Sequence, residues 1–587
     1  MRTAGLLGLF ALVYAAIVAP AFSVAYIDFG DGNYLYIAGR LADGLVLYRD
    51  ILAPQPPAHL LLGSLLIRIG RSLGGVEAQL YTVRTFSLLL HLATMLLIWA
   101  IARRLFARAS TALWAAAIHL ALPLGFWWSL GYQSEPLEMF FLLASFLCII
   151  QWERWSLAAA GLLAAAGIST NMTAVPYAGW VALFLLWHDR RRALYYIAPL
   201  GVAVAAVVGL GEWFSGGHYL ENVFFNQVGT FPHPDVIRSV PEGAPFRTLR
   251  TILGYALPKI MNEGLDVLHL EGLFVAAAIA GLLLYLRRGS ELAMPPHDDT
   301  HPEARDYHRR FVGWYAFWSF LSIAFVSKGA TMDYIFTIGE PFVALFAAYL
   351  IVHVIHRAFA REAAAGRPRA PILRSVLVAL GLLILFARPA VWVYGIVARE
   401  QALELRARDV QRIRAAILEH SKPGDAILAP PYYAFIAQRR LVEEYSELFI
   451  WHIKYLLEER VERTPGVGMR KVQNIAAALR AKAIPVVVQA YNAAPAETTA
   501  TAMVERQLTP PFAALKEQIE QQALANPQGD PPGKLIVAVR TLVPQQVFSI
   551  RPVARAMLEH YAPLFEEPIR TLNTYVNVMV VAPAARR

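Results

Sequence analysis

The feature that most constrains the fold is a series of long apolar runs separated by short basic segments. Hydrophobic residues make up 57% of the 587 residues and charged residues only 16%, whereas a soluble protein carries about 25% charged residues. Several runs reach the roughly 20 residues that an α-helix needs to cross the hydrocarbon core of a bilayer. The sequence therefore predicts a polytopic α-helical membrane protein.

Length and hydropathy together predict about eleven transmembrane helices. They lie at approximately residues 5–25, 83–101, 110–130, 136–151, 156–169, 173–188, 193–214, 267–286, 311–327, 334–355 and 372–396. The first run also fits a secretory signal peptide, because small residues follow it. Its length of about 20 residues favours an uncleaved helix.

Basic residues mark one side of the membrane. The arginines that share this side by counting spans are Arg103, Arg104, Arg108, Arg154, Arg190, Arg191, Arg192, Arg287, Arg288, Arg357, Arg361, Arg367 and Arg369. The short opposite loops 131–135 and 170–172 contain no Lys or Arg, and loop 328–333 contains only Lys328. The positive-inside rule then predicts a cytoplasmic N-terminus, with loops 26–82 and 215–266 and the C-terminal tail outside.

The composition changes after Val397, and the sequence predicts two domains, a transmembrane domain over 1–398 and a soluble α/β domain over 399–587. Candidate strands in the second domain are 425–431, 483–491, 534–542 and 574–583, with helical stretches between them. This part contains neither a G-x-G-x-x-G fingerprint nor a P-loop.

The formal net charge of +10 does not indicate a nucleic-acid partner, because the basic residues cluster between apolar runs as they do at a membrane face. The single cysteine, Cys148, excludes a disulfide within one chain and a zinc site built from cysteines. His59, His91 and His119 show no metal-ligand spacing. No cofactor follows from the residues, and a divalent metal ion stays an open option.

The loop after the first run contains a pair of acids, Asp28 and Asp31, spaced i, i+3. On a helix or a tight turn this spacing puts both carboxylates on one side. One interpretation is a general base, since a nearby like charge or partial desolvation raises the pKa of a carboxyl group. The other is a pair of solvated acids that cap the helix beginning near Gly32.

Motifs further along the chain resemble one family. They comprise Asp31-Gly32-Asn33-Tyr34, Tyr48-Arg49-Asp50, Pro56-Pro57, Arg84 with Ser87 and Leu89, Ala102-Arg103-Arg104-Leu105-Phe106, Glu135, and Tyr334 with Pro341. In this order they resemble the membrane glycosyltransferases of the GT-C superfamily. The most similar branch is that of the protein O-mannosyltransferases and the lipid A aminoarabinose transferases. The resemblance covers roughly residues 5–400 as architecture, and in motif detail 26–145 and 330–350.

The resemblance implies a catalytic Asp in the first outer loop, a polyprenyl-phosphate-linked sugar donor, and inversion at the sugar carbon. Carried over, Asp31 is the base, and Tyr34 belongs to the same motif. The family's Glu beside this Asp is Gly32 here, so either Asp28 replaces it or the register shifts by one residue.

Three further residues near this loop have two interpretations each. Tyr48 and Asp50 either shape the loop or bind the acceptor. Glu135 precedes Pro136 and either caps a helix or faces the same vestibule, where it orients an acceptor or a divalent ion.

The donor phosphate needs cations. The candidates are Lys328 in a short outer loop, Arg388 in the outer part of the last span, and Arg84 at the outer end of its span. An ionisable residue inside a span is a functional hypothesis by default. For Arg388 the alternative is snorkelling to the interface. Asp333 and Tyr334 follow Lys328 and would complete the pocket.

These expectations together describe an inverting glycosyltransferase in a bacterial-type inner membrane. It moves a sugar from a polyprenyl-phosphate donor to a hydroxyl of a protein, lipid or glycan on the outer face. Two alternatives stay open. One is a transporter or flippase of the same lipids, which predicts ionisable residues near mid-bilayer on broken helices. The other is an inactive relative that assembles the cell envelope. This alternative stays open because Gly32 stands where the family has a Glu.

Overall fold

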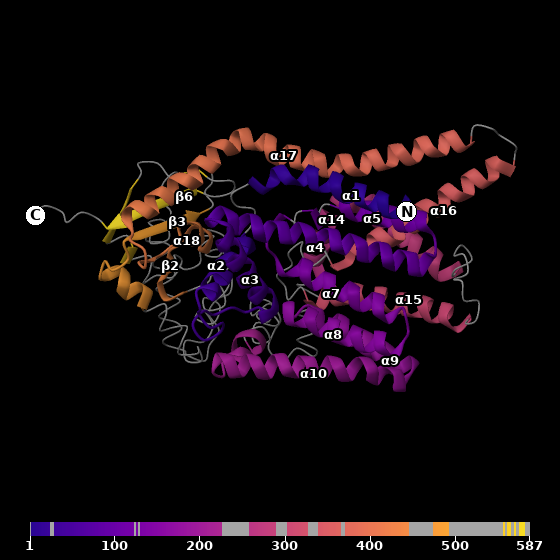
Figure 1. Cartoon of the computed structure of the whole chain (residues 1–587), viewed down its shortest axis with the longest axis horizontal. Coiled ribbons are helices and arrows are strands. Elements are labelled where there is room, and N and C mark those ends of the chain that lie inside the picture. The colour runs from indigo at the N-terminus through magenta and orange to yellow at the C-terminus, as the bar shows by residue number, and fades with distance from the viewer. Residues whose placement is uncertain are drawn as a thin grey trace, which may run out of the picture.

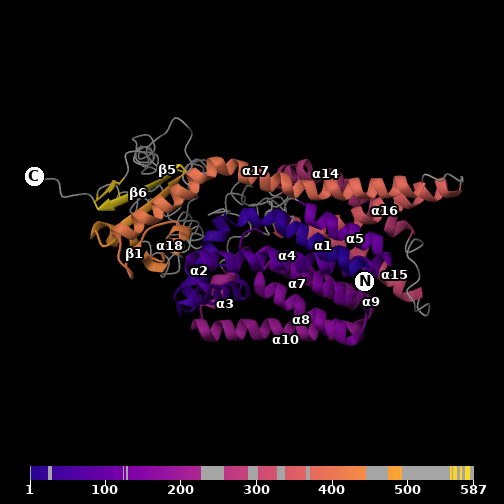
Figure 2. The same ribbon diagram turned by 45° about the horizontal axis from the view of Figure 1, so that its top comes forward.

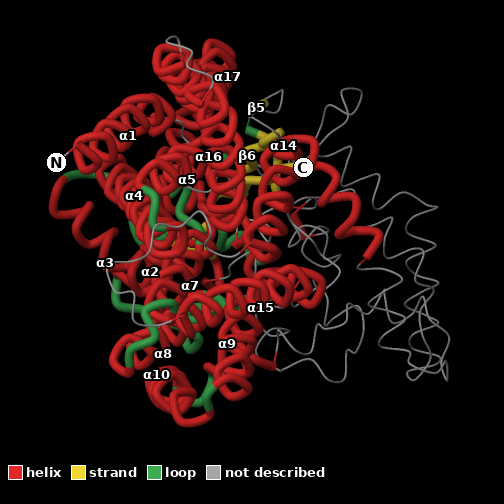
Figure 3. The backbone as a smooth tube through the Cα atoms, turned by 90° about the vertical axis from the view of Figure 1, so that its right-hand side faces the viewer, coloured by secondary structure: helices red, strands yellow, loops and turns green. Residues whose placement is uncertain are grey.

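A computed structural model describes residues 2–23, 29–122, 125–126, 130–225, 257–288, 302–326, 338–364, 370–444 and 474–491, with short segments at 556–557, 560–564, 569–570 and 575–581. The protein is a bundle of roughly aligned helices with a small sheet at one end (Figure 1). A view along the bundle shows the helices packed around one another (Figure 3).

The helices of the first part of the chain follow the apolar runs. They are α1 (Arg2–Val18), η1 (Ala19–Ser23), α2 (Phe29–Ala42), α3 (Pro57–Leu73), α4 (Val76–Phe106), α5 (Ala109–Ala121), α7 (Ser134–Ile149), α8 (Arg154–Thr170), α9 (Ala174–His188), α10 (Arg190–Ser215) and η2 (Glu221–Phe225). The later helices are α14 (Leu257–Arg288), α15 (Pro302–Val326), α16 (Glu340–Ala364), α17 (Ala370–His420), α18 (Pro431–Ala437) and η5 (Val442–Glu444).

Each predicted span falls on a described helix, but only some of these helices can cross a bilayer by their own length and hydropathy. Within the described ranges four do so, at Thr3–Phe22, Val76–Phe106, Arg190–Ser215 and Ser375–Tyr394. Three more helices, at Ala109–Ala121, Ala174–His188 and Glu340–Ile355, are apolar but shorter. Helix α5 has 13 residues, about 20 Å at 1.5 Å per residue, against a hydrocarbon core of about 30 Å. Membrane-spanning helices are therefore present, while the count of eleven stays a prediction.

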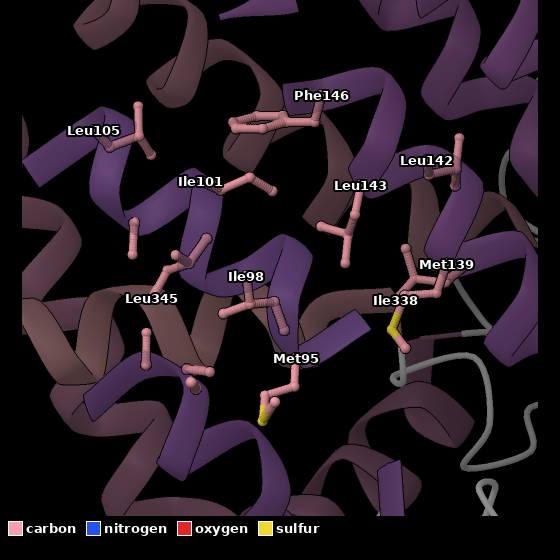
Figure 4. Close-up of a cluster of buried hydrophobic side chains, with 14 of the residues drawn as sticks. Met95, Ile98, Ile101, Leu105, Met139, Leu142, Leu143, Phe146, Ile338 and Leu345 are labelled. Atoms are coloured by element: carbon pink, nitrogen blue, oxygen red, sulfur yellow. The ribbon is translucent and has the colours of Figure 1, made fainter. Parts of the chain in front are cut away.

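The bundle is held by an apolar core between α4, α7 and α16. Figure 4 shows Met95, Ile98, Ile101 and Leu105 of α4 facing Met139, Leu142, Leu143 and Phe146 of α7, with Ile338 and Leu345 beside them. The α4 positions recur every three or four residues, which is the helical period of a buried face. Glycines allow close approach elsewhere, because a Cβ at Gly161 of α8 would collide with the backbone of α10.

The sheet end contains β1 (Ala426–Ile427), β2 (Arg440–Leu441), β3 (Val486–Tyr491), β4 (Tyr561–Pro563), β5 (Ile569–Arg570) and β6 (Tyr575–Val581). Strand β6 pairs antiparallel with β3, with β4 and with β5, and Val488 lies opposite Val578. Strands β1 and β2 pair in parallel. The predicted strands around 426, 486 and 575 are therefore found, and the one at 534–542 lies outside the described residues.

Among the described residues, the sheet shares its hydrophobic core with the neighbouring helices. One cluster of buried side chains joins α2 and α3 to α18 and to strands β1, β3 and β6. Helix α17 runs without interruption from the membrane part into this end, through the predicted boundary at 398/399 (Figure 2). The division into 1–398 and 399–587 stays a prediction, and α2 and α3 share buried contacts with residues on both sides of that boundary.

Candidate active site

Helix α2 positions the acid that the sequence singles out. Asp31 lies in the first turn of α2 (Phe29–Ala42), where a carboxylate is stabilised by the partial positive charge of the helix N-terminus. Its backbone is described and its side chain is not, and Asp28 lies outside the described residues. Tyr34 follows one turn later, so it shares a face of the helix with Asp31.

Tyr34 begins a stack of three buried rings from three elements. Its ring meets the edge of His59 of α3 with 4.7 Å between centroids, and His59 stacks on Tyr132 at 4.1 Å and 20°. The Tyr132 hydroxyl donates a hydrogen bond of 2.6 Å to the His59 carbonyl. Burial lowers the pKa of His59 to about 3, so this imidazole is neutral at physiological pH. The stack fixes the face of α2 that carries Asp31 relative to the segment before α7.

A glycine makes this contact possible. A Cβ at Gly63 of α3 would lie 2.8 Å from Cε1 of Tyr132 and 2.9 Å from Cβ of Ala38 in α2. Both distances are shorter than van der Waals contact between carbon atoms. Helices α2 and α3 and the Tyr132 ring therefore meet at a point where only glycine fits without a shift.

Tyr48 and Asp50 shape the loop between α2 and α3. The Tyr48 hydroxyl donates 2.7 Å to the carbonyl of Gln55, its backbone adopts a φ of 69°, and its side chain is buried. Asp50 accepts from the backbone N–H of Val46 at 2.8 Å and from both Nε and Nη2 of Arg49. These contacts favour the structural interpretation of the two residues.

The ring stack leads to a buried pair of acids at the start of α7. Glu135 is 6% exposed, and its Oε1 accepts a hydrogen bond of 3.3 Å from the amide of Asn171. Glu138 is fully buried, and its Oε1 accepts from the hydroxyl of Thr173 at 2.5 Å. Asn171 also donates to the hydroxyl of Ser134 at 3.2 Å. The segment between α8 and α9 therefore holds both carboxylates in place.

Glu138 was missed in the sequence, although a signal was present. It lies three residues after Glu135 within an apolar run, and an ionisable residue inside a span is a functional candidate. Among the described residues, Oε2 of Glu138 has no hydrogen-bond partner. The start of α7 thus carries two buried acids, Glu135 and Glu138, instead of the one that the family motif indicates.

Two of the predicted cations, Arg84 and Arg388, lie within the described residues. Arg84 of α4 is 2% exposed and donates 2.6 Å to the carbonyl of Phe22, which ties η1 to α4. Arg388 of α17 lies over the rings of Phe274 at 5.0 Å and Trp392 at 5.3 Å. The other candidates for the phosphate pocket, Lys328, Asp333 and Tyr334, lie outside the described residues.

A second group of buried polar side chains lies inside the bundle. The rings of His91 and His119 are 4.5 Å apart between centroids, and Tyr14 lies 5.3 Å from His91. Glu340 accepts from the backbone N–H of Gly125 at 2.8 Å. Across the described segments, no group of three or more His, Cys, Asp or Glu side chains could hold a metal ion. The side chains of Asp28 and Asp31 lie outside these segments.

The sheet end contacts α2 directly on the turns after Tyr34. Arg40 donates from Nη2 to Glu444 at 2.6 Å and from Nε to both carboxylate oxygens at 3.0 and 3.2 Å. The Tyr36 hydroxyl donates 2.6 Å to the same carboxylate and accepts 2.7 Å from the N–H of Leu441. Burial, together with the charge of Glu444, raises the pKa of Tyr36 well above its ordinary value. Glu444 therefore links the C-terminal part to the helix that carries Asp31.

This geometry defines the class of protein: a helical membrane protein in which α2 and α3 pack against the C-terminal strands. Residues 55–211 match the family described as dolichyl-phosphate-mannose-protein mannosyltransferase. None of the curated proteins compared with the chain matches it.

Solved structures with the same fold cover nearly the whole chain. ArnT from Cupriavidus metallidurans, solved with undecaprenyl phosphate, superposes with a TM-score of 0.54 at 12% identity over 98% of this chain and 97% of its own. The oligosaccharyltransferase AglB from Archaeoglobus fulgidus, solved with an inhibitory peptide and a dolichol-phosphate, gives 0.50 at 13% identity over 99% and 88%. The resemblance to the GT-C superfamily glycosyltransferases near the ArnT and mannosyltransferase branch is confirmed.

Proposed function

We propose that the protein is an inverting glycosyltransferase that uses a polyprenyl-phosphate-linked sugar as donor. The observation that carries the proposal is the position of Asp31. It lies in the first turn of α2, one turn before the ring stack of Tyr34, His59 and Tyr132, in a chain with the GT-C fold. ArnT and AglB were solved with undecaprenyl phosphate and dolichol-phosphate, and these ligands support a lipid-linked donor.

In the proposed reaction an acceptor hydroxyl attacks the anomeric carbon of the sugar. The new C–O bond forms as the bond between that carbon and the phosphate oxygen breaks, and the bonding electrons leave with the polyprenyl phosphate. Asp31 takes the proton of the attacking hydroxyl, a task worth roughly 10² to 10⁴ in rate. The attack from the face opposite to the leaving group inverts the sugar carbon.

Acidic and basic side chains near the proposed site would assist this reaction. Glu135 and Glu138 offer hydrogen-bond acceptors that could orient the acceptor's hydroxyl groups, because Asn171 and Thr173 hold them at the start of α7. Arg388, or Lys328 beyond the described residues, would stabilise the charge on the departing phosphate. Asp333 and Tyr334 would complete that pocket, Arg84 would anchor the first span beside it, and Tyr48 and Asp50 would hold the loop.

The proposed site is on the outer face of a bacterial-type inner membrane, with the N-terminus in the cytoplasm and the C-terminus outside. The arginines of the short loops support this orientation. The C-terminal part, over 399–587, would then lie above α2 and help to bind a protein, lipid or glycan acceptor.

The experiment is turnover by the purified protein. The protein is incubated with a radiolabelled polyprenyl-phosphate sugar and an extract of envelope acceptors, and released polyprenyl phosphate and labelled acceptor are measured together. We expect both products in equal amounts. Movement of intact donor across a vesicle membrane without release of polyprenyl phosphate would instead show a flippase. Binding of donor with neither outcome would show an inactive relative.

A further inference from the structure

A cavity lies between helices α1, α5, α16 and α17, away from the α2–α3 end. It is partly open to the surface and has a volume of about 230 Å³. Its wall includes Leu6, Phe10, Trp114, Val352 and Leu382. Figures 1 and 2 both show α1 lying along α17 in this part of the bundle. The indole of Trp114 packs closely against α17 at Gly381, where a Cβ would lie only 2.6 Å from the ring.

The position of the cavity favours hydrocarbon over water as its occupant. Two of its walls, α1 and α17, belong to the helices that are long and apolar enough to span a membrane. A cavity of this size exceeds by far the roughly 10–15 Å³ that a single water needs, but water also needs two or more polar partners. Most of the wall is apolar and provides none, since Arg108 and Ser110 are the polar residues that line it, whereas the surrounding bilayer provides acyl chains.

One charged group lines the same cavity. Arg108, the residue before α5, is half-buried and lines it together with Ser110. Among the described residues its guanidinium has neither an ion-pair partner nor a side-chain hydrogen bond, and no Asp or Glu lines the cavity. The neighbouring Arg103 is already engaged with the carbonyl of Ala107 at 2.9 Å. A half-buried cation without a carboxylate favours an anionic ligand.

This cavity is distinct from the proposed catalytic site. Arg108 follows the C-terminal end of α4, and the α2–α3 region precedes the other end of that helix. Helix α4 has 31 residues, which corresponds to about 46 Å along its axis. A headgroup at Arg108 would therefore lie at the opposite end of the bundle from Asp31.

We propose that this cavity is a binding site for an anionic phospholipid, with one acyl chain between α1, α5, α16 and α17 and the headgroup phosphate on Arg108. The guanidinium donates two hydrogen bonds to the phosphate oxygens, a geometry that arginine provides and lysine does not. The lipid fills the gap between two spans and so stabilises the packing of α1 and α17 against α5.

The test measures lipid binding to the purified full-length protein by native mass spectrometry. After delipidation in detergent, the protein is titrated with phosphatidylglycerol, and parallel titrations use phosphatidylethanolamine and undecaprenyl phosphate. Arg108→Gln removes the charge, and Leu382→Trp fills the cavity. The matched controls are Arg287→Gln, at an exposed arginine, and Leu383→Trp, at a neighbouring side chain that is 67% exposed.

We expect each site variant to weaken phosphatidylglycerol binding about tenfold, equivalent to about 1.4 kcal/mol, while the controls bind as the unaltered protein does. Equal binding by site and control variants overturns the proposal, as does equal affinity for phosphatidylethanolamine. Competition by undecaprenyl phosphate for the same site would assign the cavity to the donor lipid and overturn it too. Leu382→Trp keeps the charge, so it tests the site even if Arg108→Gln does not fold.

Discussion

Removal of the Glu444 carboxylate should loosen the C-terminal part from α2. In Glu444→Ala, Arg40 loses its bidentate partner but keeps Asp43 at 2.6 Å, and the Tyr36 hydroxyl loses its acceptor inside the core. The side chains of Arg40 and Glu444 are 20% and 17% exposed, so this ion pair is intermediate between a surface pair and a buried pair. Surface pairs contribute about 0–1 kcal/mol, and breaking a buried pair costs about 3–5 kcal/mol. The expected loss is about 2–3 kcal/mol. Glu444 has a φ of 47°. Ala is as strained as Glu at this φ, so backbone strain does not contribute to the change in stability.

The assay is hydrogen exchange of the backbone amides over residues 431–444, which contain α18 and η5. When opening is fast and reversible, the exchange rate reports the free energy of local opening. A loss of 2–3 kcal/mol corresponds to exchange about 30- to 150-fold faster. A double-mutant cycle with Arg40→Ala should give a coupling free energy of about 1–3 kcal/mol.

The control is a second ion pair between the same two parts of the chain. Arg414 lies 3.0 Å from Glu77, but these side chains are 27% and 59% exposed. Glu77→Ala should therefore change the free energy of local opening of α18, as reported by amide exchange, by less than about 1 kcal/mol. Equal effects of Glu444→Ala and Glu77→Ala, or no effect of either, would refute the argument that the buried network docks the C-terminal part on α2.

Three further predictions concern packing, pH and topology. Gly63→Ala should destabilise the protein by about 1–2 kcal/mol in thermal unfolding, since the clash with Tyr132 exceeds the helix gain, whereas Gly179→Ala, with open space around it, should not. Because folding raises the pKa of Tyr36, stability is full below about pH 10, the ordinary tyrosine value, and falls as the pH rises above it; Tyr36→Phe should flatten this fall. An alkaline phosphatase fused after Arg587 should be active, and one fused at Arg104 inactive; the reverse would overturn the orientation.

Hydrophobic periodicity and run length were enough to predict where the helices lie. The runs at 83–101 and 193–214 fall within α4 and α10, and the strands around 426, 486 and 575 are found. The extents were less predictable, because helix ends depend on local chain reversals. The run at 110–130 predicted one span, whereas α5 ends at Ala121.

The contacts that build the site could not be predicted from local sequence. Tyr36 and Glu444 are 408 residues apart in the chain, and neither has a neighbouring motif that indicates the other. The stack of Tyr34, His59 and Tyr132 depends on how three elements pack, which no spacing within one element reveals. Glu138 differs from these, because an acid within an apolar run is visible in the sequence alone.

Tyr48 and Asp50 match the family motif but have a structural role in the loop. Tyr48 and Asp50 carry part of the family pattern, and in the structure both are engaged in the backbone turn between α2 and α3. A motif can persist because it fixes a loop, so its presence does not separate a structural role from contact with a substrate.

The central claim is that Asp31 removes the proton of the acceptor, and single-turnover transfer by Asp31→Asn tests it most directly. Asn keeps the size of the side chain but cannot take a proton at neutral pH, so we expect transfer to slow by roughly 10² to 10⁴, or about 3–5 kcal/mol, with donor binding unchanged. Asp28→Asn should slow transfer less if Asp28 only tunes the pKa of Asp31 through its charge. A larger effect of Asp28→Asn would move the base to Asp28, and near-normal transfer by both variants would contradict the mechanism.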